Sequence, residues 1–360
     1  MKLIFALATL LAYSVHAHSP VSLNQDRSLV RLQATPAVMK ILRTHDVDVA
    51  GVNIKNNTIE ALVTTEELQL FDGMKSAVKF QIPSTLLRGP DPEYMTSTEV
   101  EARLRDFAAK YPELTQLRQV GESLEKRPIW AIKISDNAQI HETNEPVAFF
   151  NAMHHAREVM TPEVAMDIVE YLLTNYNSND EARKWVEGYE IWVMPMFNVD
   201  GNNKVWNGDA MWRKNTRDGY GADLNRNYPY AWNTCRGSSG NTWAQDYRGK
   251  TPASEPETQV MMNFVKEIHP VSSISYHSYS ELVIYPYGCR PLRAETAAVV
   301  EGMGKEIATK LGYTPGTSWE TLYNTDGGDI DWYYHDVQVI PFVIEVSSDS
   351  EGFQPAYADC

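Results

Sequence analysis

The sequence predicts an α/β protein in which helices cover both faces of a mixed, twisted central sheet, preceded by a small ferredoxin-like α+β unit. Three observations support this prediction. Apolar runs without polar alternation recur between residues 128 and 346, as in strands buried on both faces. Helical patterns lie between several of these runs, and residues 28–82 follow the order βαββαβ. At 360 residues, 43% of them apolar, the chain is long enough to build such a core.

The first residues, MKLIFALATLLAYSVHAHS, are typical of a secretory signal peptide. Lys2 precedes an apolar stretch from Leu3 to Val15, and Val15-His16-Ala17 is a suitable cleavage site. The stretch is shorter than the roughly 20 residues of a membrane span, which argues against a spanning helix, and no later segment resembles one. We therefore expect residues 1–17 to be removed and the protein to be secreted, or exported to the periplasm in a Gram-negative bacterium.

Residues 28–82 contain the pattern of the small unit. Thr35 and Pro36 are a typical N-cap and first position of a helix, and Asn56-Asn57 separates two strand-like runs as a hairpin turn does. The expected elements are strand 28–33, helix 35–45, strand 47–54, strand 58–63, helix 64–72 and strand 77–82. The next stretch, PSTLLRGPDPEYMT, is dense in Pro and Gly and predicts a linker in which Arg88 is an exposed protease site.

A larger unit begins near Asp91. The sequence Thr98-Glu99-Val100-Glu101 predicts a capping box for a helix that ends before Pro112. A second capping box is expected at the start of the helix 254–268. Apolar strands are expected at residues 128–135, 147–152, 189–196, 271–277, 282–287 and 340–346, and further helices at 162–174 and 294–311.

Charge and cysteine content narrow the function classes. A formal net charge of -15 argues against a nucleic-acid partner, because such proteins neutralise phosphates with clustered Lys and Arg. Of the three cysteines, Cys235 and Cys289 are able to pair, and Cys360 is the last residue. Export permits a disulfide but does not require one.

The stretch NAMHHAREVMTP, residues 151–162, places metal-binding residue types at the end of an apolar strand. Thr161 and Pro162 fit the N-cap and first position of the next helix, so Met153–Met160 is expected to be a loop. In α/β sheets, ligands bind at the carboxyl ends of strands. The imidazole and carboxylate groups of this loop suit a zinc ion. A buried histidine bonded to a carboxylate would explain the pattern equally well.

Other polar residues end neighbouring apolar runs. His277 would complete a His, Glu, His ligand set with an open fourth position, as in catalytic zinc sites. Glu345 lies late in an apolar strand, where a carboxylate is costly unless it has a function or forms a structural ion pair. Arg213 and Asn225-Arg226 add cations, which suggests an anionic substrate group or a developing oxyanion.

At this point the sequence resembles a known family. The motifs HHAREVMTPE, MFNVDG, MWRKN, GADLNRNYP, SYHSYSELVIYPYG, YNTDGGDIDW and FVIEVSS occur in the order and approximate spacing of the zinc metallocarboxypeptidases of the carboxypeptidase A, B and T family. The resemblance covers roughly Tyr94 to Phe353 and implies a zinc-dependent exopeptidase with one catalytic zinc ion, acting on the C-termini of peptides and proteins.

The resemblance also implies roles for individual residues. It makes His155, Glu158 and His277 the zinc ligands, with His154 as a neighbour and Asp223 as a residue that orients a ligating histidine. Glu345 matches the catalytic glutamate, and Arg213 matches the arginine that polarises the scissile carbonyl. The expected substrate-binding residues are Arg157, Asn225, Arg226, Tyr279, Tyr323 and Ile330.

The small N-terminal unit resembles the propeptide of this family, which covers the cleft. We expect residues 18–88 to be an inhibitory propeptide that an activating protease releases by cleavage after Arg88, and the enzyme to be a monomer. An unrelated binding module is the alternative. Residues 91–360 match the catalytic domain, but the final helix of the family is not expected in this sequence.

Side-chain preference is the least determined property. Ile330 resembles the floor of the specificity pocket and favours apolar or aromatic C-terminal residues, for which Ser318 leaves room. Asp326 and Asp329 would instead accept a basic residue if they point inward, unless they only form a turn. A metallo-amidase acting on cell-wall peptides or acylated amino acids, and an inactive binding protein, are the rival functions. The intact Asn225, Arg226 and Tyr323 argue against the amidase.

Overall fold

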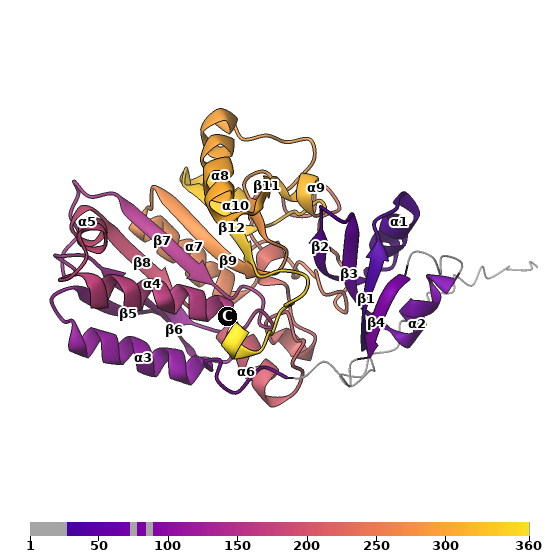
Figure 1. The fold of residues 1–360 in the computed structure, drawn as a ribbon, viewed down its shortest axis with the longest axis horizontal. Coiled ribbons are helices and arrows are strands. Elements are labelled where there is room, and N and C mark those ends of the chain that lie inside the picture. The colour runs from indigo at the N-terminus through magenta and orange to yellow at the C-terminus, as the bar shows by residue number, and fades with distance from the viewer. Residues whose placement is uncertain (1–26, 73–77, 84–88, 360) are drawn as a thin grey trace, which may run out of the picture.

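The computed structural model describes residues 27–72, 78–83 and 89–359, without the side chains of 78–83. The expected signal peptide, residues 1–17, and the expected cleavage site at Arg88 lie outside the described residues. Figure 1 shows a small N-terminal unit beside a larger unit built on one sheet. Among the described residues, no helix is long and apolar enough to cross a membrane.

The N-terminal unit has the predicted order βαββαβ. Its elements are β1 (Arg27–Gln33), α1 (Pro36–Thr44), β2 (Asp48–Asn53), β3 (Thr58–Thr64), α2 (Thr65–Gln69) and β4 (Val78–Pro83). The sheet order is β2-β3-β1-β4, and β1 pairs antiparallel with both neighbours, which is the ferredoxin-like arrangement. Thr35 caps α1 as predicted, with its side chain accepting a hydrogen bond from the Val38 backbone. The strand β2 lies at the edge of this sheet.

The larger unit contains an eight-stranded sheet with the order β11-β10-β12-β9-β7-β8-β6-β5. Its strands are β5 (Thr115–Glu122), β6 (Pro128–Ile134), β7 (Val147–Ala152), β8 (Glu190–Met194), β9 (Ser272–Ser278), β10 (Leu282–Ile284), β11 (Thr314–Gly316) and β12 (Ile340–Val346). The pairs β7 with β8, β7 with β9 and β9 with β12 are parallel, whereas β5 with β6, β6 with β8 and β10 with β12 are antiparallel. The sheet is therefore mixed, as predicted.

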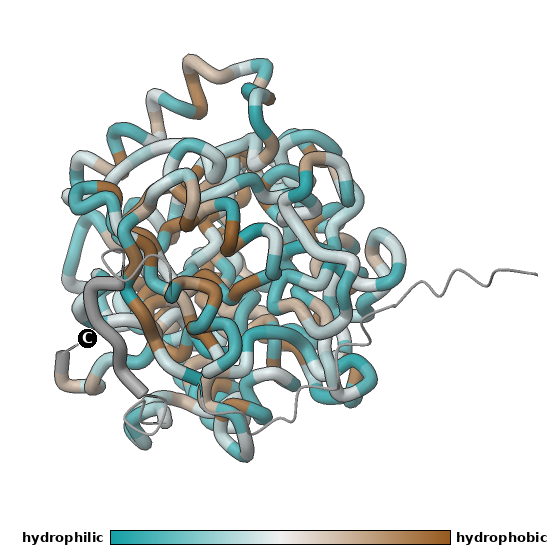
Figure 2. Tube along the Cα trace, turned by 90° about the vertical axis from the view of Figure 1, so that its right-hand side faces the viewer, coloured by the Kyte–Doolittle hydropathy of each residue, from teal (hydrophilic) through white to brown (hydrophobic). Residues whose placement is uncertain are grey.

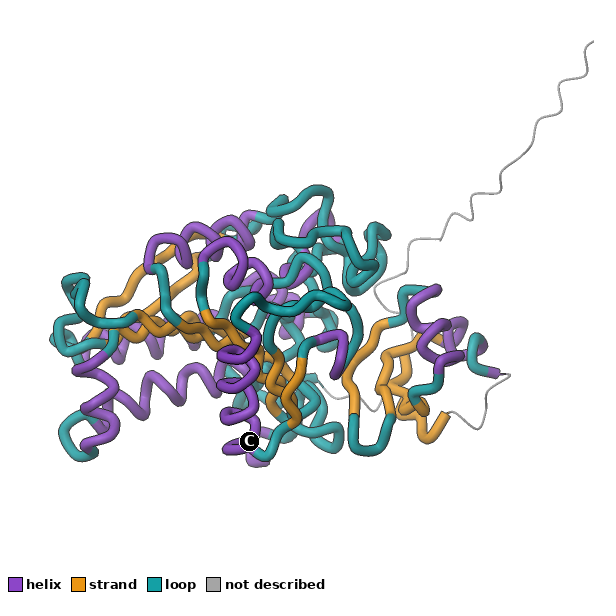
Figure 3. The backbone as a smooth tube through the Cα atoms, turned by 90° about the horizontal axis from the view of Figure 1, so that it is seen from above, coloured by secondary structure: helices purple, strands orange, loops and turns teal. Residues whose placement is uncertain are grey.

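Helices flank this sheet on both sides (Figures 1 and 3). They are α3 (Ser97–Lys110), α4 (Thr161–Asn175), α5 (Asp180–Gly188), α6 (Val199–Asn207), α7 (Pro256–Ile268), α8 (Ala297–Leu311), α9 (Ser318–Thr321) and α10 (Asp329–Trp332). Short 3₁₀ or π turns are η3 (Arg217–Gly219), η4 (Leu224–Arg226), η5 (Tyr333–Val337) and η6 (Tyr357–Asp359). In Figure 1, α3 and α4 lie in front of the sheet and α7 lies behind it.

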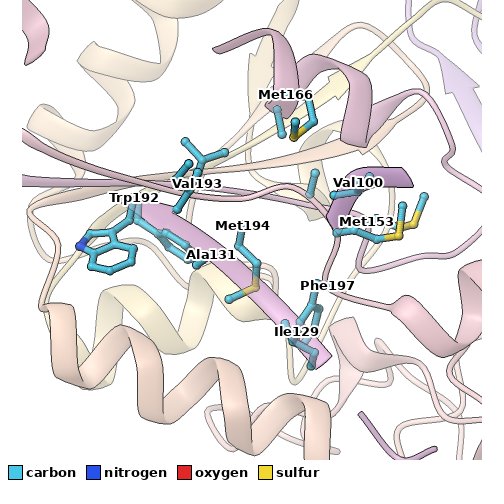
Figure 4. Close-up of a cluster of buried hydrophobic side chains, with 14 of the residues drawn as sticks. Val100, Ile129, Ala131, Met153, Met166, Trp192, Val193, Met194 and Phe197 are labelled. Carbon is cyan, nitrogen blue, oxygen red and sulfur yellow. The ribbon is translucent and has the colours of Figure 1, made fainter. Parts of the chain in front are cut away.

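The main core lies between the sheet and these helices. The side chain of Phe264 in α7 makes edge-to-face contacts with Phe149 and Trp192, at ring separations of 5.6 and 5.3 Å. Figure 4 shows Trp192, Met194, Phe197 and Met166 among the buried side chains that fill this region. Seen from the side of the N-terminal unit, apolar segments gather in the interior (Figure 2). Packing in this core fixes the positions of the strand ends that carry the polar motifs.

Four predicted helix starts are wrong, and the simplest is that of α8, which begins at Ala297 instead of Ala294. The capping box of α3 is formed by Thr96 and Glu99, not by Thr98 and Glu101. The helix α7 has Glu255 as its N-cap without a side-chain hydrogen bond, because the carboxylate of Glu257 accepts instead from the distant Leu124 backbone and the Asn215 side chain.

The fourth correction concerns α4. Its N-cap is Met160, and Thr161 is the first helical residue, with its hydroxyl donating to the Glu158 carbonyl. Residues 153–160 remain a loop, as expected. A disulfide joins Cys235 and Cys289, the pair that the sequence allows.

Candidate active site

Two histidines and one glutamate meet at the carboxyl ends of β7 and β9. His155 and Glu158 lie in the loop after β7, and His277 lies near the end of β9. Because these strands are parallel neighbours, their carboxyl ends share one edge of the sheet. One ligand atom from each side chain lies within 4.8 Å of the others, and all three side chains are buried.

The donor atoms of this cluster fit a single zinc ion. Nδ1 of His155 lies 2.7 Å from Oε1 of Glu158, and Nδ1 of His277 lies 3.1 Å from Oε2 of Glu158. The two Nδ1 atoms lie 3.2 Å apart. Two imidazoles and one carboxylate that face one point are the protein ligands of many catalytic zinc sites.

The carboxylate of Asp223 contacts the His155 ring at Nε2, the nitrogen that does not face Glu158. Nε2 of His155 lies 3.2 Å from Oδ1 of Asp223, so a metal at Nδ1 would leave Nε2–H to donate to this carboxylate. Asp223 also accepts hydrogen bonds from Nε and Nη2 of Arg213, at 3.1 and 2.8 Å. Burial would raise the pKa of Asp223, but Arg213 and His155 hold it well below its usual value. The carboxylate is therefore ionised.

The buried charges of the cluster shift several pKa values. Burial would raise the pKa of Glu158, but His155 and His277 lower it. For His277, burial lowers the pKa and Glu158 raises it more, to about 9. A divalent cation would thus compete with a proton for this ring.

Glu345 lies beside the cluster on β12. It stands opposite His277 in the parallel register of β12 and β9. Burial raises the pKa of Glu345 to about 8; His277 opposes the rise and Glu158 adds to it. A carboxyl group with such a pKa can exchange protons near neutral pH.

The cluster opens into a cavity of about 70 Å³. Its lining brings together most of the predicted site residues: His155, Glu158, Arg213, Asn225, Arg226, His277, Tyr279, Tyr323, Ile330 and Glu345. Nη1 of Arg226 donates to the Asn225 carbonyl at 2.6 Å and Nε donates to the Gly237 carbonyl at 3.1 Å. Arg226 is buried, yet it forms no ion pair with any carboxylate in the described part of the chain.

The apolar part of the cavity is formed by Ile284, Leu322, Ile330 and Val343, with Ser318 beside them. Asp326 does not line the cavity, because its carboxylate accepts from the backbone N–H groups of Cys235 and Gly237 and from the Ser238 hydroxyl. Asp329 lines it and is fully buried, and neither of its carboxylate oxygens has a hydrogen-bond donor among the described residues. Its Oδ2 lies 3.7 Å from Nε2 of His154.

Two predicted substrate-binding residues are engaged by the N-terminal unit. Both terminal nitrogens of Arg157 donate to the carboxylate of Asp48, at 2.6 and 2.9 Å. The Tyr279 hydroxyl donates to Oε2 of Glu60 at 2.5 Å. Arg157 does not reach the cavity lining.

Sequence reasoning missed Asp48 and Glu60, which lie in ordinary strand patterns. It also left His154 without a role. The His154 ring is fully buried and stacks on the His277 ring, with centroids 5.4 Å apart. Its Nε2 lies 3.1 Å from the Tyr228 hydroxyl. The doubled histidine in HHARE was the only signal for this contact.

Comparison with known proteins decides the family. The model of the family described as zinc carboxypeptidase, Peptidase_M14, matches residues 100–359. The chain belongs to the zinc carboxypeptidase family. This family uses one catalytic zinc ion, and His155, Glu158 and His277 are the residues of this chain that fit it.

Curated relatives agree with this assignment. Carboxypeptidase O of Bos taurus is 29% identical over 252 residues, which is 66% of this chain and 66% of the relative. Carboxypeptidase B of Rattus norvegicus is 27% identical over 345 residues, 89% of this chain and 81% of the relative. A zinc carboxypeptidase of Saccharothrix mutabilis subsp. capreolus is 32% identical over 282 residues, 73% of this chain and 64% of the relative. The chain thus spans only about two thirds of the length of several of these relatives.

Solved structures support the fold. The crystal structure of thrombin activatable fibrinolysis inhibitor (TAFI) aligns with a TM-score of 0.78 at 23% identity, covering 93% of this chain and 95% of that one. Carboxypeptidase A from Helicoverpa armigera aligns with a TM-score of 0.77 at 20% identity, covering 90% and 89%. The fold of this chain is therefore that of these two structures.

Proposed function

We propose that this protein is a zinc-dependent exopeptidase that removes one residue from the C-terminus of peptides and proteins. The observation that most supports this function is the position of Arg226. Its buried guanidinium lines the same cavity as the zinc-binding cluster and has no carboxylate partner in the described chain. A guanidinium fork in that position suits the free carboxylate of a peptide terminus.

The residues around the cluster divide the chemistry among them. When bound, the zinc ion would act as a Lewis acid that lowers the pKa of water, so that hydroxide is available to attack an amide near neutral pH. Glu345, which lines the same cavity, would remove a proton from the attacking water and deliver it to the leaving amine. Arg213 holds Asp223 through Nε and Nη2, and its Nη1 has no acceptor among the described residues, so it is free to donate to the scissile carbonyl oxygen.

The arrangement accounts for removal of a single residue. Asn225 and Tyr323 line the cavity beside Arg226 and would hold the terminal carboxylate with it. This anchor places only the last peptide bond of a substrate at the cluster. An internal peptide bond offers no carboxylate, so its binding would leave Arg226 buried and unpaired.

Apolar and aromatic C-terminal residues fit the cavity best. Ile284, Leu322, Ile330 and Val343 form its apolar wall, and the carboxylate of Asp326 is occupied by donors of the segment 235–238. A preference for basic residues is the second candidate, because the buried carboxylate of Asp329 lies in the same lining without a donor.

The N-terminal unit acts as an inhibitory propeptide. Val49, Ala50 and Gly51 of β2 line the cavity, and the apolar core of the unit continues into Leu282, Ile284, Ile330 and Val343 of the larger unit. Asp48 and Glu60 engage Arg157 and Tyr279. Substrate would have to displace these contacts, so a protease that cuts in the linker after Arg88 would activate the enzyme.

Export fits the same account. The first residues resemble a signal peptide, and disulfides such as Cys235–Cys289 persist mainly in oxidising compartments. We expect the protein to be a monomer that binds peptide C-termini as substrates and is cleaved by an activating protease. Nucleic acid and membranes have no role in this proposal.

The test is hydrolysis of two blocked dipeptides, one ending in phenylalanine and one in arginine, after trypsin activation and with or without a zinc chelator. Release of phenylalanine that the chelator abolishes is expected. Release of arginine instead would indicate a preference for basic C-terminal residues, with Asp329 as the group that binds them. If the chelator has no effect on either release, the zinc mechanism is wrong; if neither dipeptide is cut while zinc is bound, the metallo-amidase becomes the better function.

A further inference from the structure

We propose that the activated enzyme selects substrates with an acidic side chain upstream of the scissile bond, and that Arg157 binds this second carboxylate. The inference rests on the proposed carboxypeptidase function. It assigns to the cleft a recognition of charge that is separate from the pocket for the C-terminal side chain.

The counter-ions of the buried arginines suggest this role. Arg157, Arg213 and Arg226 are the arginines that are buried in the described part of the chain. Arg213 is paired with Asp223 inside the larger unit. Arg226 has no ion-pair partner among the described residues, and in the proposed function it binds the terminal carboxylate of the substrate. Arg157 has a carboxylate partner, Asp48, but this residue belongs to the unit that activation removes.

The environment of Arg157 is built for an anion. Its side chain is fully buried, and its guanidinium lies 4.3 Å from the centre of the Phe353 ring. Among the described residues, Asp48 is the only one that forms an ion pair with it, and Nε has no hydrogen-bond partner. When Asp48 leaves, the guanidinium loses its counter-ion while its surroundings in the larger unit stay apolar on one side. A carboxylate with the bidentate geometry of Asp48 would restore the pair.

The strand that carries Asp48 occupies the cleft as an extended peptide would. The backbone N–H of Val52 donates to the Ser280 hydroxyl at 3.0 Å. Gly51 packs so closely on the Tyr279 ring that an added Cβ would lie 2.4 Å from a ring carbon. The Val52 contact uses the edge of β2 that does not pair with β3, so the Ser280 hydroxyl is available to the backbone of a substrate once β2 has left.

Asp48 is a better guide to substrate than the other carboxylate at this interface. Glu60 accepts from the Tyr279 hydroxyl, but it is also paired with Arg31 of its own unit. Among the described residues Asp48 forms no ion pair with its own unit: its hydrogen bonds, from Nη1 and Nη2, both come from Arg157, and Arg27 acts on it only at longer range. The acidic preference is therefore expected at the one substrate position that reaches Arg157.

The experiment uses the full chain after activation by cleavage in the linker, and matched peptides that all end in phenylalanine. Each carries Glu, Gln or Lys at the second, third or fourth position from the C-terminus. At one position we expect kcat/KM for Glu to exceed that for Gln by roughly tenfold, with Lys lowest. Equal values at all three positions would overturn this inference alone, because phenylalanine release would still support the carboxypeptidase. Release from none of the peptides would contradict the proposed function, and with it this inference.

Variants assign the effect to one side chain. Arg157→Gln should reduce the ratio of kcat/KM for Glu over Gln to about one, and Arg157→Lys should restore part of it because it restores the charge. The control is Arg118→Gln, on the distant edge strand β5, which should keep the ratio of the unmodified enzyme. Zinc content reports whether each variant is folded at the site. A ratio that survives in zinc-loaded Arg157→Gln would show that another group makes the selection.

Discussion

Asp48 and Arg157 lie 109 residues apart in the chain and join the two units through hydrogen bonds of 2.6 and 2.9 Å. The carboxylate and the guanidinium are both buried. Removing one partner of such a pair leaves the other charge without compensation in a dry environment. This contact therefore links the docking of the N-terminal unit to the substrate-binding face of the larger unit.

Asp48→Asn should weaken inhibition in the uncleaved protein. The neutral amide cannot balance the charge of Arg157, so the N-terminal unit docks less tightly and the uncleaved protein should gain roughly tenfold in hydrolysis of a blocked phenylalanine dipeptide. Glu66→Gln is the matched control, since Glu66 is an exposed acidic residue of the same unit. Uncleaved wild-type protein that is already as active as the cleaved form would rule out an inhibitory role.

Acid should separate the two units. Burial would raise the pKa of Asp48, but Arg157 lowers it further, so the net shift is below the usual 3.8. The contribution of the pair to docking is fully present above pH 3.8 and is lost as the pH falls through the lowered pKa. Rebinding of the released N-terminal unit, added in excess to the cleaved enzyme and followed by gel filtration, should therefore be strongest above about pH 4 and weaken in more acidic buffer. In Asp48→Asn, the rebinding should depend less on pH over this range.

Glu345→Gln should separate metal binding from catalysis. The amide keeps the shape of the side chain but cannot accept the proton of the attacking water, so kcat should fall by roughly 10²-fold to 10⁴-fold. Zinc content should stay near one ion per chain, because His155, Glu158 and His277 are unchanged. His277→Gln, in contrast, should lose both zinc and activity. Substantial turnover by zinc-loaded Glu345→Gln would require another proton acceptor.

Ile330→Asp should change the side-chain preference. A carboxylate in the apolar wall of the cavity would pair with a basic side chain. With an aromatic side chain bound, the same carboxylate would lose its water without gaining a partner, which costs free energy. The ratio of arginine to phenylalanine release should rise by roughly 100-fold. Ile330→Val preserves the apolar surface and should leave the preference for phenylalanine in place. If the aspartate variant keeps that preference too, Ile330 does not contact the C-terminal side chain.

Much of the fold could be predicted because burial leaves a clear mark on the sequence. The bounds of β7 and β12 match the expected strands, since both are nearly continuous apolar runs in the middle of the sheet. The strand β5 was not predicted, because it lies at the edge and most of its residues are only partly buried. The helix α5 was missed as well, since only Ala182 and Val186 of its nine residues are buried.

Helix starts were harder, because a local pattern can fit two registers. Both Thr96 and Thr98 have glutamate three residues later, and only tertiary contacts choose between them. The Ser97 backbone donates to Asn202 and the Met95 backbone donates to Glu163, which fixes the chain entering α3. Neither partner is visible in a window of sequence around the helix.

The site divides in the same way. The motifs place His155, Glu158, His277 and Glu345 at strand ends, and parallel pairing then brings them together without further information. The contact of Asp48 with Arg157 depends on how the two units pack against each other, and no sequence periodicity encodes that packing. The sequence offered Asp326 and Asp329 as acceptors of a basic residue but did not decide which of them points inward, because the burial of Asp329 follows from the packing of α10 against the cavity.

The most direct test of the proposed exopeptidase compares one peptide with a free C-terminal carboxylate and the same peptide with a C-terminal amide, by mass spectrometry after activation. Recognition by Arg226 predicts loss of one residue from the free acid, at least 100-fold faster than any cleavage of the amide, and zinc should restore the rate after chelation. Equal cleavage of the two peptides, or cleavage at internal bonds, would contradict the account.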